Sequence, residues 1–200
     1  MRRSLLLAAV ASLALAPLAL ADEGVVPIFD GKTFNGWKAN EGGKSWTIED
    51  GALTGRGGRG HVFYVQDELD DFELKVDVRI NEGGNSGIYF HTRYQEEGWP
   101  AAGHEVQVNN THADPVKTGS LYDVVKLYES AGKDNEWFTM HIAVKGDNLR
   151  VTVAGKLVLD YTQPPGVTIP RRIDRGTIAF QQHDPKSVVQ YRNILLKKLN

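Results

Sequence analysis

Residue-by-residue alternation of apolar and polar side chains limits the fold of this chain more than any other feature. In the segment 72–80, FELKVDVRI, five apolar side chains lie on one side and four charged ones on the other. A period of two residues is that of a β-strand with one face in a core. Similar segments recur, separated by Gly, Asn, Asp and Pro, whereas no long segment after residue 21 has the apolar spacing of an amphipathic helix.

These segments predict an all-β fold. Many short antiparallel strands without helices are typical of a sandwich of two antiparallel sheets. The segment 138–162 is expected to form consecutive hairpins, because KGDN and AGK supply turns within it. The longest irregular stretches, 95–102, 110–123 and 162–175, are expected to be functional or mobile loops. Strands are expected within 45–55, 61–65, 72–80, 86–94, 104–110, 138–162, 176–183 and 188–199.

Residues 1–21 have the organisation of a secretory signal peptide. Arg2 and Arg3 precede an apolar segment, 5–20, and Ala-Leu-Ala at its end fits a small-x-small cleavage site. The segment is shorter than the ~20 residues of a membrane-spanning helix. We therefore expect cleavage near Ala21, export to the periplasm or the medium, and no membrane span afterwards. The rest, 22–200, suits one domain.

The charge of the chain argues against nucleic acid as a partner. With Arg2 and Arg3 removed, 25 acidic residues stand against 21 basic ones, which gives a net charge of −4, and there is no basic block. The chain has no cysteine, so the core must hold the domain together without disulfides. The sequence does not indicate an oligomeric state.

Three of the expected strands carry polar faces that differ from an ordinary solvated surface. Aromatic, imidazole, guanidinium and amide groups make the stacking contacts and paired hydrogen bonds by which proteins hold sugars, whereas Lys and Glu would serve solubility. We therefore predict a carbohydrate site on these faces, with Trp99 in a loop as a further stacking group. The outward groups are Tyr89, His91 and Arg93 in 86–94, Glu105, Gln107 and Asn109 in 104–110, and Gln181 and His183 in 176–183.

The chain resembles the 3-keto-disaccharide hydrolase family through an ordered set of motifs covering roughly 26–199. No single motif is decisive, but their order is specific. This resemblance implies a concanavalin A-like jelly roll with a carbohydrate site on its concave face, and glycosides already oxidised to a ketone at carbon 3 as substrates. The motifs are PIFDGKTFNGWK, WTIEDGALTG, DFELKVDVRI, GGNSGIYFHTR, GHEVQVNN, TGSLYD, EWFTMHIAVKGDNLRVTVAGKLV and GTIAFQQH followed by VQYRNILLKKL.

The resemblance also implies which individual positions match the family motifs. The chain departs from the family pattern at three positions: Asn109 where Asp is usual, Phe138 where Asn usually follows the Trp, and Asp184 where Gly is common. The first departure counts against a mechanism that needs a second acid on that strand. The matched positions are Asn85, Ser86 and Gly87, then Glu105 and Gln107, then Gln181 and His183, and finally Arg192 and Asn193.

The strand that carries Glu105 has no second carboxylate. Ordinary retaining glycosidases use two carboxylates about 5–5.5 Å apart, so this strand alone disfavours that reaction, although a loop Asp or Glu could complete a pair. Cleavage of a 3-keto sugar does not need a pair of carboxylates, because the ketone acidifies the proton on carbon 2 and the group on carbon 1 can leave by β-elimination. Glu105 or His183 is the candidate base. His91, Arg93, Gln107 or a bound divalent ion is the candidate to stabilise the enolate.

No cofactor is required by the sequence, but a divalent metal is left open. His91, Glu105 and His183 would suit zinc, manganese or iron if their strands adjoin. There is no local motif such as HExxH, so no ligands are assigned. The expected function is cleavage of 3-keto-glycosides or 3-keto-disaccharides with carbohydrate as the partner. A non-catalytic carbohydrate-binding module and an ordinary glucan hydrolase are the rival interpretations.

Overall fold

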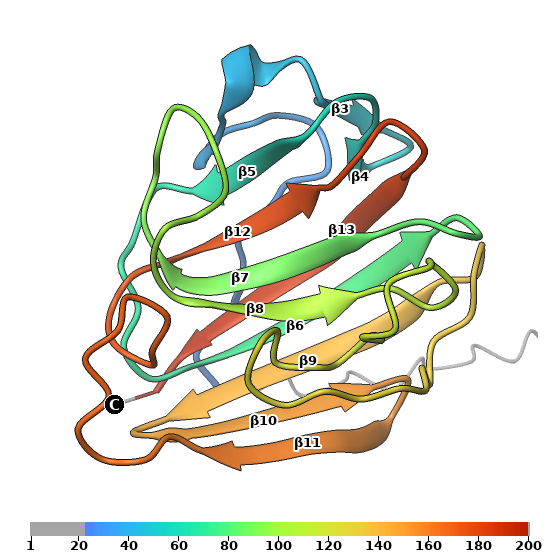
Figure 1. The fold of residues 1–200 in the computed structure, drawn as a ribbon. Helices are drawn as coiled ribbons and strands as arrows, with labels where there is room; N and C mark the ends of the chain where they lie inside the picture. The colour runs from blue at the N-terminus through green and yellow to red at the C-terminus, as the bar shows by residue number, and fades with distance from the viewer. Residues whose placement is uncertain (1–22, 200) are drawn as a thin grey trace, which may run out of the picture.

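The computed structural model describes residues 23–199 and consists of two antiparallel β-sheets packed face to face (Figure 1). The smaller sheet contains, in spatial order, β2 (Trp37–Ala39), β5 (Gly60–Tyr64), β12 (Thr177–Gln182), β7 (Ser86–Thr92) and β8 (His104–Val108). The larger sheet contains β11 (Lys156–Thr162), β10 (Asn148–Val153), β9 (Phe138–Lys145), β6 (Phe72–Ile80), β13 (Val189–Lys198), β4 (Ala52–Gly55) and β3 (Trp46–Glu49), with β1 (Val25–Pro27) beside β13.

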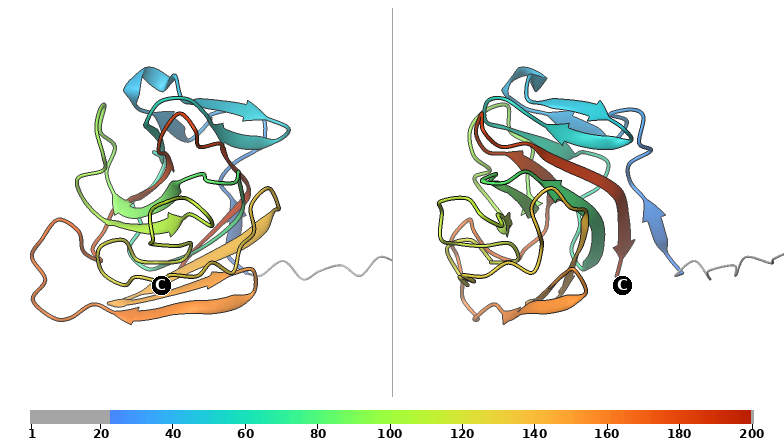
Figure 2. Two further views of the ribbon diagram at one scale, coloured as in Figure 1. Left: turned by 45° about the vertical axis from the view of Figure 1, so that its right-hand side comes forward. Right: turned by 90° about the vertical axis from the view of Figure 1, so that its right-hand side faces the viewer.

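The predicted all-β sandwich is therefore confirmed. Neighbouring strands in both sheets run antiparallel, and only the short 3₁₀ turn Glu41–Gly43 interrupts the strands and loops of the described residues. The turned views of Figure 2 show the two layers and the loops that extend from one side of them. The expected strand segments contain β3, β4 and β6 to β13, and β5 begins one residue before its expected segment. β1 and β2, three residues each, are too short to give an alternating pattern.

Aromatic stacking joins the two sheets in the core. Phe180 of β12 stacks on Tyr191 of β13 with ring centres 4.1 Å apart. Trp37 of β2 also stacks on Phe180, with ring centres 5.1 Å apart. Trp37 and Trp46 are buried, because their strands point them between the sheets. Trp137 is only half-buried, and its ring packs against the Arg192 guanidinium.

The smaller sheet differs from the larger one in being buried on both faces. Every residue of β5, β7, β8 and β12 is buried, whereas β6 of the larger sheet alternates between buried and more exposed positions. One face of the smaller sheet packs on the core, so its other face must be covered by the long loops. The smaller sheet is thus a floor with loops above it, where polar side chains are removed from bulk water.

A β-bulge interrupts the pairing of β7 with β12. Thr92 pairs with Thr177 and Tyr89 pairs with Ala179, so Phe90 and His91 together lie opposite the single residue Ile178. His91 has a positive φ of 54°, which places the extra residue of the bulge in the left-handed region. After the bulge, the side chains of β7 no longer follow the alternation between the two faces of the sheet that the residues before it set.

The expected signal peptide, 1–21, lies outside the described residues. Between residues 23 and 199, the structure has no helix whose length and apolar character would let it cross a membrane.

Candidate functional site

A cavity of about 230 Å³ lies on the face of the smaller sheet that points away from the core. Its floor comes from adjacent strands, because the core-facing neighbours Ile88, Val106 and Phe180 leave the alternate positions on the other side. The loops supply the walls. The lining residues are Asn85, Tyr89, Trp99, Glu105, Gln107, Asp114, Tyr122, Arg171, Gln181 and His183.

Glu105, on the edge strand β8, lies on the floor of the cavity within a network from three neighbouring strands. The Tyr89 hydroxyl donates to Glu105 Oε2 at 2.7 Å, and Gln181 Nε2 donates to Glu105 Oε1 at 2.9 Å. The side chain of Glu105 is 5 % exposed, and burial raises the pKa of its carboxyl to about 7, even though Tyr89, Arg171 and Gln181 act against the rise. A carboxyl of this kind changes its protonation state near neutral pH.

Gly87 of β7 makes room for the Glu105 side chain. A Cβ atom at position 87 would lie 2.2 Å from Glu105 Oε1 and 2.7 Å from its Cγ. The glycine of the Asn-Ser-Gly motif is therefore needed for space and not for an unusual backbone angle. Asn85 of the same motif accepts a hydrogen bond from Gln107 Nε2 at 3.0 Å, which fixes both side chains at the edge of the cavity.

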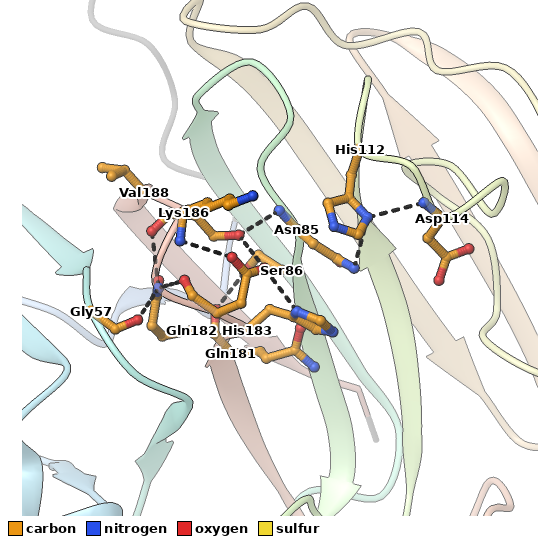
Figure 3. Close-up of polar contacts among 12 residues, drawn as sticks. Gly57, Asn85, Ser86, His112, Asp114, Gln181, Gln182, His183, Lys186 and Val188 are labelled. Atoms are coloured by element: carbon orange, nitrogen blue, oxygen red, sulfur yellow. Dashed lines mark hydrogen bonds and ion pairs between the residues drawn. The ribbon is translucent and has the colours of Figure 1, made fainter.

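His183 is oriented by the residue that follows it. Its Nδ1 lies 2.9 Å from Asp184 Oδ2, and Asp184 also accepts hydrogen bonds from the Lys186 amide and the Ser187 hydroxyl (Figure 3). Burial opposes ionisation of Asp184, but these hydrogen bonds outweigh it and hold the pKa of Asp184 below its usual value. An ionised Asp184 can only accept, so Nδ1 carries the proton and Nε2 is left for a ligand.

An aromatic wall stands beside His183. Trp99 is 41 % exposed, and its ring centre lies 5.3 Å from that of His183 and 5.3 Å from the guanidinium carbon of Arg59. His61 lies behind this wall, with its ring 5.6 Å from Trp99 and 5.5 Å from Tyr89. Burial, assisted by Arg59, lowers the pKa of His61 to about 3, so this histidine stays neutral and acts as packing. The glycine-rich segment 55–60 borders the site, because its Arg59 packs against Trp99.

Several cavity residues were not predicted as site residues from the sequence. Tyr89 had a usable signal, because alternation already placed it on the outward face of its strand, although no role in the site was assigned to it. Asp114, Tyr122 and Arg171 had none beyond their position in long irregular stretches. Arg171 reaches the cavity with its Nη1 atom buried and without a hydrogen-bond partner. Asp114 brings a second carboxyl group, from a loop, to the cavity that holds Glu105.

Of the predicted site residues, the structure brings Glu105, Gln107, Gln181, His183 and Trp99 together. It does not bring His91, Arg93 or Asn109 to the cavity. The bulge turns His91 into the protein, where it packs against Phe72, and Arg93 is exposed beside a separate surface groove. The expectation of one continuous face from Tyr89 through Arg93 was wrong because alternation does not survive a bulge.

Asn109 has a structural task instead. Its Nδ2 donates to the carbonyl groups of Asp114 and Val116, at 3.0 and 2.8 Å, and its Oδ1 accepts from the His112 amide at 2.9 Å. These bonds shape the loop that delivers Asp114 to the cavity. The exchange of an acid for an amide at this position is consistent with such a role, since an ionised carboxylate could not donate the first two bonds.

The metal-ligand set that the sequence left open is not assembled. His91 lies away from the cavity that holds Glu105 and His183. Among residues 23–199, no group of three or more His, Cys, Asp or Glu side chains is placed to hold a metal ion.

Substitution of Gly87 by Ala should destabilise the protein by about 1–3 kcal/mol, because the new methyl group overpacks against Glu105. The loss should be partly relieved in the background of Glu105→Ala, which removes the clashing atoms. Gly58→Ala is the matched control, since nothing lies within 4 Å of its added Cβ. Urea unfolding of the four variants would measure this, and an equal loss in both backgrounds would contradict the packing assignment.

Replacement of Glu105 by Gln should stabilise the protein only at neutral and alkaline pH. The carboxyl of Glu105 has a pKa of about 7 in the folded protein, against the ordinary 4.5. The free energy of unfolding of the wild type is therefore highest below pH 4.5 and decreases as the pH rises to about 7. The free energy of unfolding of the variant relative to that of the wild type should increase by up to about 3 kcal/mol between pH 4.5 and pH 7. Unfolding at several pH values would measure it, with the exposed Glu129→Gln as control; a pH-independent difference would refute the raised pKa.

Comparison with known proteins places the chain among carbohydrate-active relatives. A family model described as the 3-keto-alpha-glucoside-1,2-lyase-like domain matches residues 24–197. A 3-keto-disaccharide hydrolase of Bacteroides thetaiotaomicron is 30 % identical, over 61 % of this chain and 53 % of that protein. The chain thus spans about half the length of this curated relative.

Two solved structures share the architecture. A Parabacteroides distasonis protein, crystallised as a candidate glycosyl hydrolase, superposes with a TM-score of 0.75 at 25 % identity, covering 89 % of this chain and 95 % of the other. The carbohydrate-binding module CBM66 of Bacillus subtilis superposes with a TM-score of 0.59 at 16 % identity, covering 82 % and 96 %, and shares the fold alone. Since the family model spans nearly all of residues 23–199 and the fold agrees, the chain belongs to the 3-keto-alpha-glucoside-1,2-lyase-like domain family.

Proposed function

We propose that this chain cleaves glycosides whose sugar ring carries a ketone at carbon 3. The observation that carries the proposal is Glu105, a buried carboxyl with a pKa of about 7, in one cavity with the partnerless guanidinium nitrogen of Arg171. Removal of a proton next to a ketone needs a base and a positive group for the oxygen. The 3-keto substrates in the names of the family and of the Bacteroides relative support the same substrate class.

Glu105 acts as the general base in this scheme. Its carboxylate removes the proton from carbon 2, and the electron pair moves into the carbon 2–carbon 3 bond and onto the ketone oxygen as an enolate. A base with a pKa near the working pH combines a large ionised fraction with a strong pull on the proton. Tyr89 and Gln181 hold both carboxyl oxygens in place, so the base is positioned before substrate arrives.

Arg171 stabilises the negative charge that develops on the ketone oxygen. Its Nη1 is a buried donor without a partner, which favours any ligand that accepts a hydrogen bond there. Preorganised donors directed at a developing oxyanion contribute about 10²–10³-fold each. This role was expected of His91, Arg93, Gln107 or a metal ion, and a loop arginine supplies it in our proposal.

His183 assists departure of the group on carbon 1. When the enolate reforms the ketone, the carbon 1–oxygen bond breaks, and the imidazolium form of His183, whose Nδ1–H stays on Asp184, passes its Nε2 proton to the leaving oxygen. The product is an unsaturated ketone with a double bond between carbons 1 and 2. Addition of water, with hydroxyl to carbon 1 and the proton to carbon 2, would complete a net hydrolysis. If the reaction stops before water adds, it is that of a lyase.

The cavity size and Trp99 suggest how the substrate lies. The volume of about 230 Å³ is below that of pockets that hold drug-sized ligands, so we propose that a single oxidised ring enters. The remainder of the glycoside then stacks on Trp99, whose half-exposed ring borders the cavity. Export, inferred from residues 1–21, stays a prediction and would place this reaction outside the cytoplasm.

The central test is an assay of the wild type with a 3-keto-glucoside. We expect kcat/KM to increase with pH up to about 7, as Glu105 ionises, and Glu105→Gln to lose about 10²–10⁴-fold, the usual contribution of a positioned base. In D₂O the hydrated product should carry deuterium on carbon 2. Parallel assays with a chelator would reveal a metal requirement. Saturable sugar binding without turnover would identify a non-catalytic module instead.

Asp114 favours a second candidate function, that of an ordinary glycoside hydrolase. It is the loop carboxyl that could complete a pair with Glu105, since both line one cavity. In that case Asp114→Asn should abolish cleavage of an unoxidised glucoside, and carbon 2 should stay free of deuterium. If the 3-keto mechanism operates, unoxidised glucosides should not react at all, and Asp114→Asn should leave deuterium incorporation intact. The matched control is Asp147→Asn in the β9–β10 turn.

A further inference from the structure

We propose that His91 is a positioning residue that holds the loop between β11 and β12 so that Arg171 reaches the cavity. The inference rests on the role proposed for Arg171 above. His91 was expected to bind substrate, yet it lies outside the cavity. Its contacts connect it to the segment next to Arg171, and these contacts give it a different task.

The His91 imidazole joins two separate segments through their backbones. Its Nε2 lies 2.8 Å from the carbonyl oxygen of Asp70, and its Nδ1 accepts the amide of Asp174 at 3.0 Å. A carbonyl only accepts and an amide only donates, so the ring is neutral with its proton on Nε2. The residue is 2 % exposed and its ring packs against Phe72 and Phe90, which fixes the direction of both bonds.

Other contacts secure the same loop on both sides of Arg171. The amide of Gly103 donates to the carbonyl of Pro170 at 3.0 Å. Gln163 accepts from the Ile173 amide at 2.6 Å and donates to the Ile173 carbonyl at 3.2 Å. With His91 on Asp174, the backbone is thus tied just before Arg171 and at the second and third residues after it. A fixed backbone limits the region that the Arg171 guanidinium can reach.

The bulge that removes His91 from the cavity is what makes this attachment geometrically available. Gly103 and Gly176 pack against the backbone of the bulge, so closely that a Cβ at Gly176 would lie 2.5 Å from the His91 carbonyl carbon. The loop between β11 and β12 therefore returns to the sheet at the bulge itself, through Gly176. Burial lowers the pKa of His91, which keeps the ring in the neutral form that both bonds require.

The proposal separates two substitutions that are often treated alike. In His91→Asn the side-chain oxygen lies near the place of Nδ1 and can still accept from Asp174, but nothing reaches Asp70. In His91→Gln the amide nitrogen can reach Asp70, but the Asp174 amide loses its acceptor. We expect amide exchange at Asp174 to quicken more than tenfold in His91→Gln and much less in His91→Asn, relative to the exchange of core strand amides in the same variant.

Turnover of a 3-keto-glucoside gives the second readout. We expect His91→Gln to lower kcat about tenfold or more with little change in KM, since Arg171 acts on the developing oxyanion. In the background of Arg171→Met the same substitution should lower kcat less than twofold, because His91 acts through that arginine. His141→Asn is the matched control, since this histidine pairs with Glu73 on the outer side of the larger sheet.

Two results would overturn the proposal. One is unchanged exchange at Asp174 in His91→Gln, which would mean that the loop does not depend on this bond. The other is an equal loss of kcat with and without Arg171, which would mark a general effect on the fold. Asn suits a positive φ better than Gln, so melting temperatures alone do not decide the matter. Absence of any wild-type turnover would refute the proposed function, while the exchange data would still test the loop attachment.

Discussion

The burial of one carboxyl group, that of Glu105, is the constraint on which the rest of the site depends. An ionised carboxylate away from water is costly, and hydrogen bonds from neighbouring side chains offset only part of that cost. Three adjacent strands at one edge of the smaller sheet meet this demand together: β8 carries the acid, β7 and β12 carry Tyr89 and Gln181, and Gly87 leaves the space. The sheet order β12-β7-β8 is what makes these partners neighbours.

The loops complete what the strands begin. Strands place side chains at regular spacing but on one plane, so they form a floor without walls. Trp99, Asp114, Tyr122 and Arg171 come from three different loops and close that floor into a cavity. Two of these loops are held by buried side chains, Asn109 for one and Gln163 with His91 for the other, and this division between a rigid floor and tethered walls suits a site that must exclude water.

The sequence allowed the floor to be predicted and the walls only in outline. Alternation identifies the outward position of Glu105, Gln107 and Gln181 because a strand's period is two and pairing keeps it. It fails at His91, since a bulge has no pattern of its own in a single sequence. Arg171 could not be found because loop conformation depends on distant partners, and Asp184 was noted only as a departure from a family pattern although it orients His183.

The one-residue excess in β7 has a consequence for how such a chain can change over time. Loss of either Phe90 or His91 from the gene would restore one-to-one pairing with β12, because one residue would then lie opposite Ile178 while Thr92 stayed opposite Thr177. The attachment of the loop between β11 and β12 to His91 would vanish in the same event. An insertion or deletion here is therefore a single genetic step that alters sheet and loop together, and homologues should preserve length at this point more strictly than residue identity.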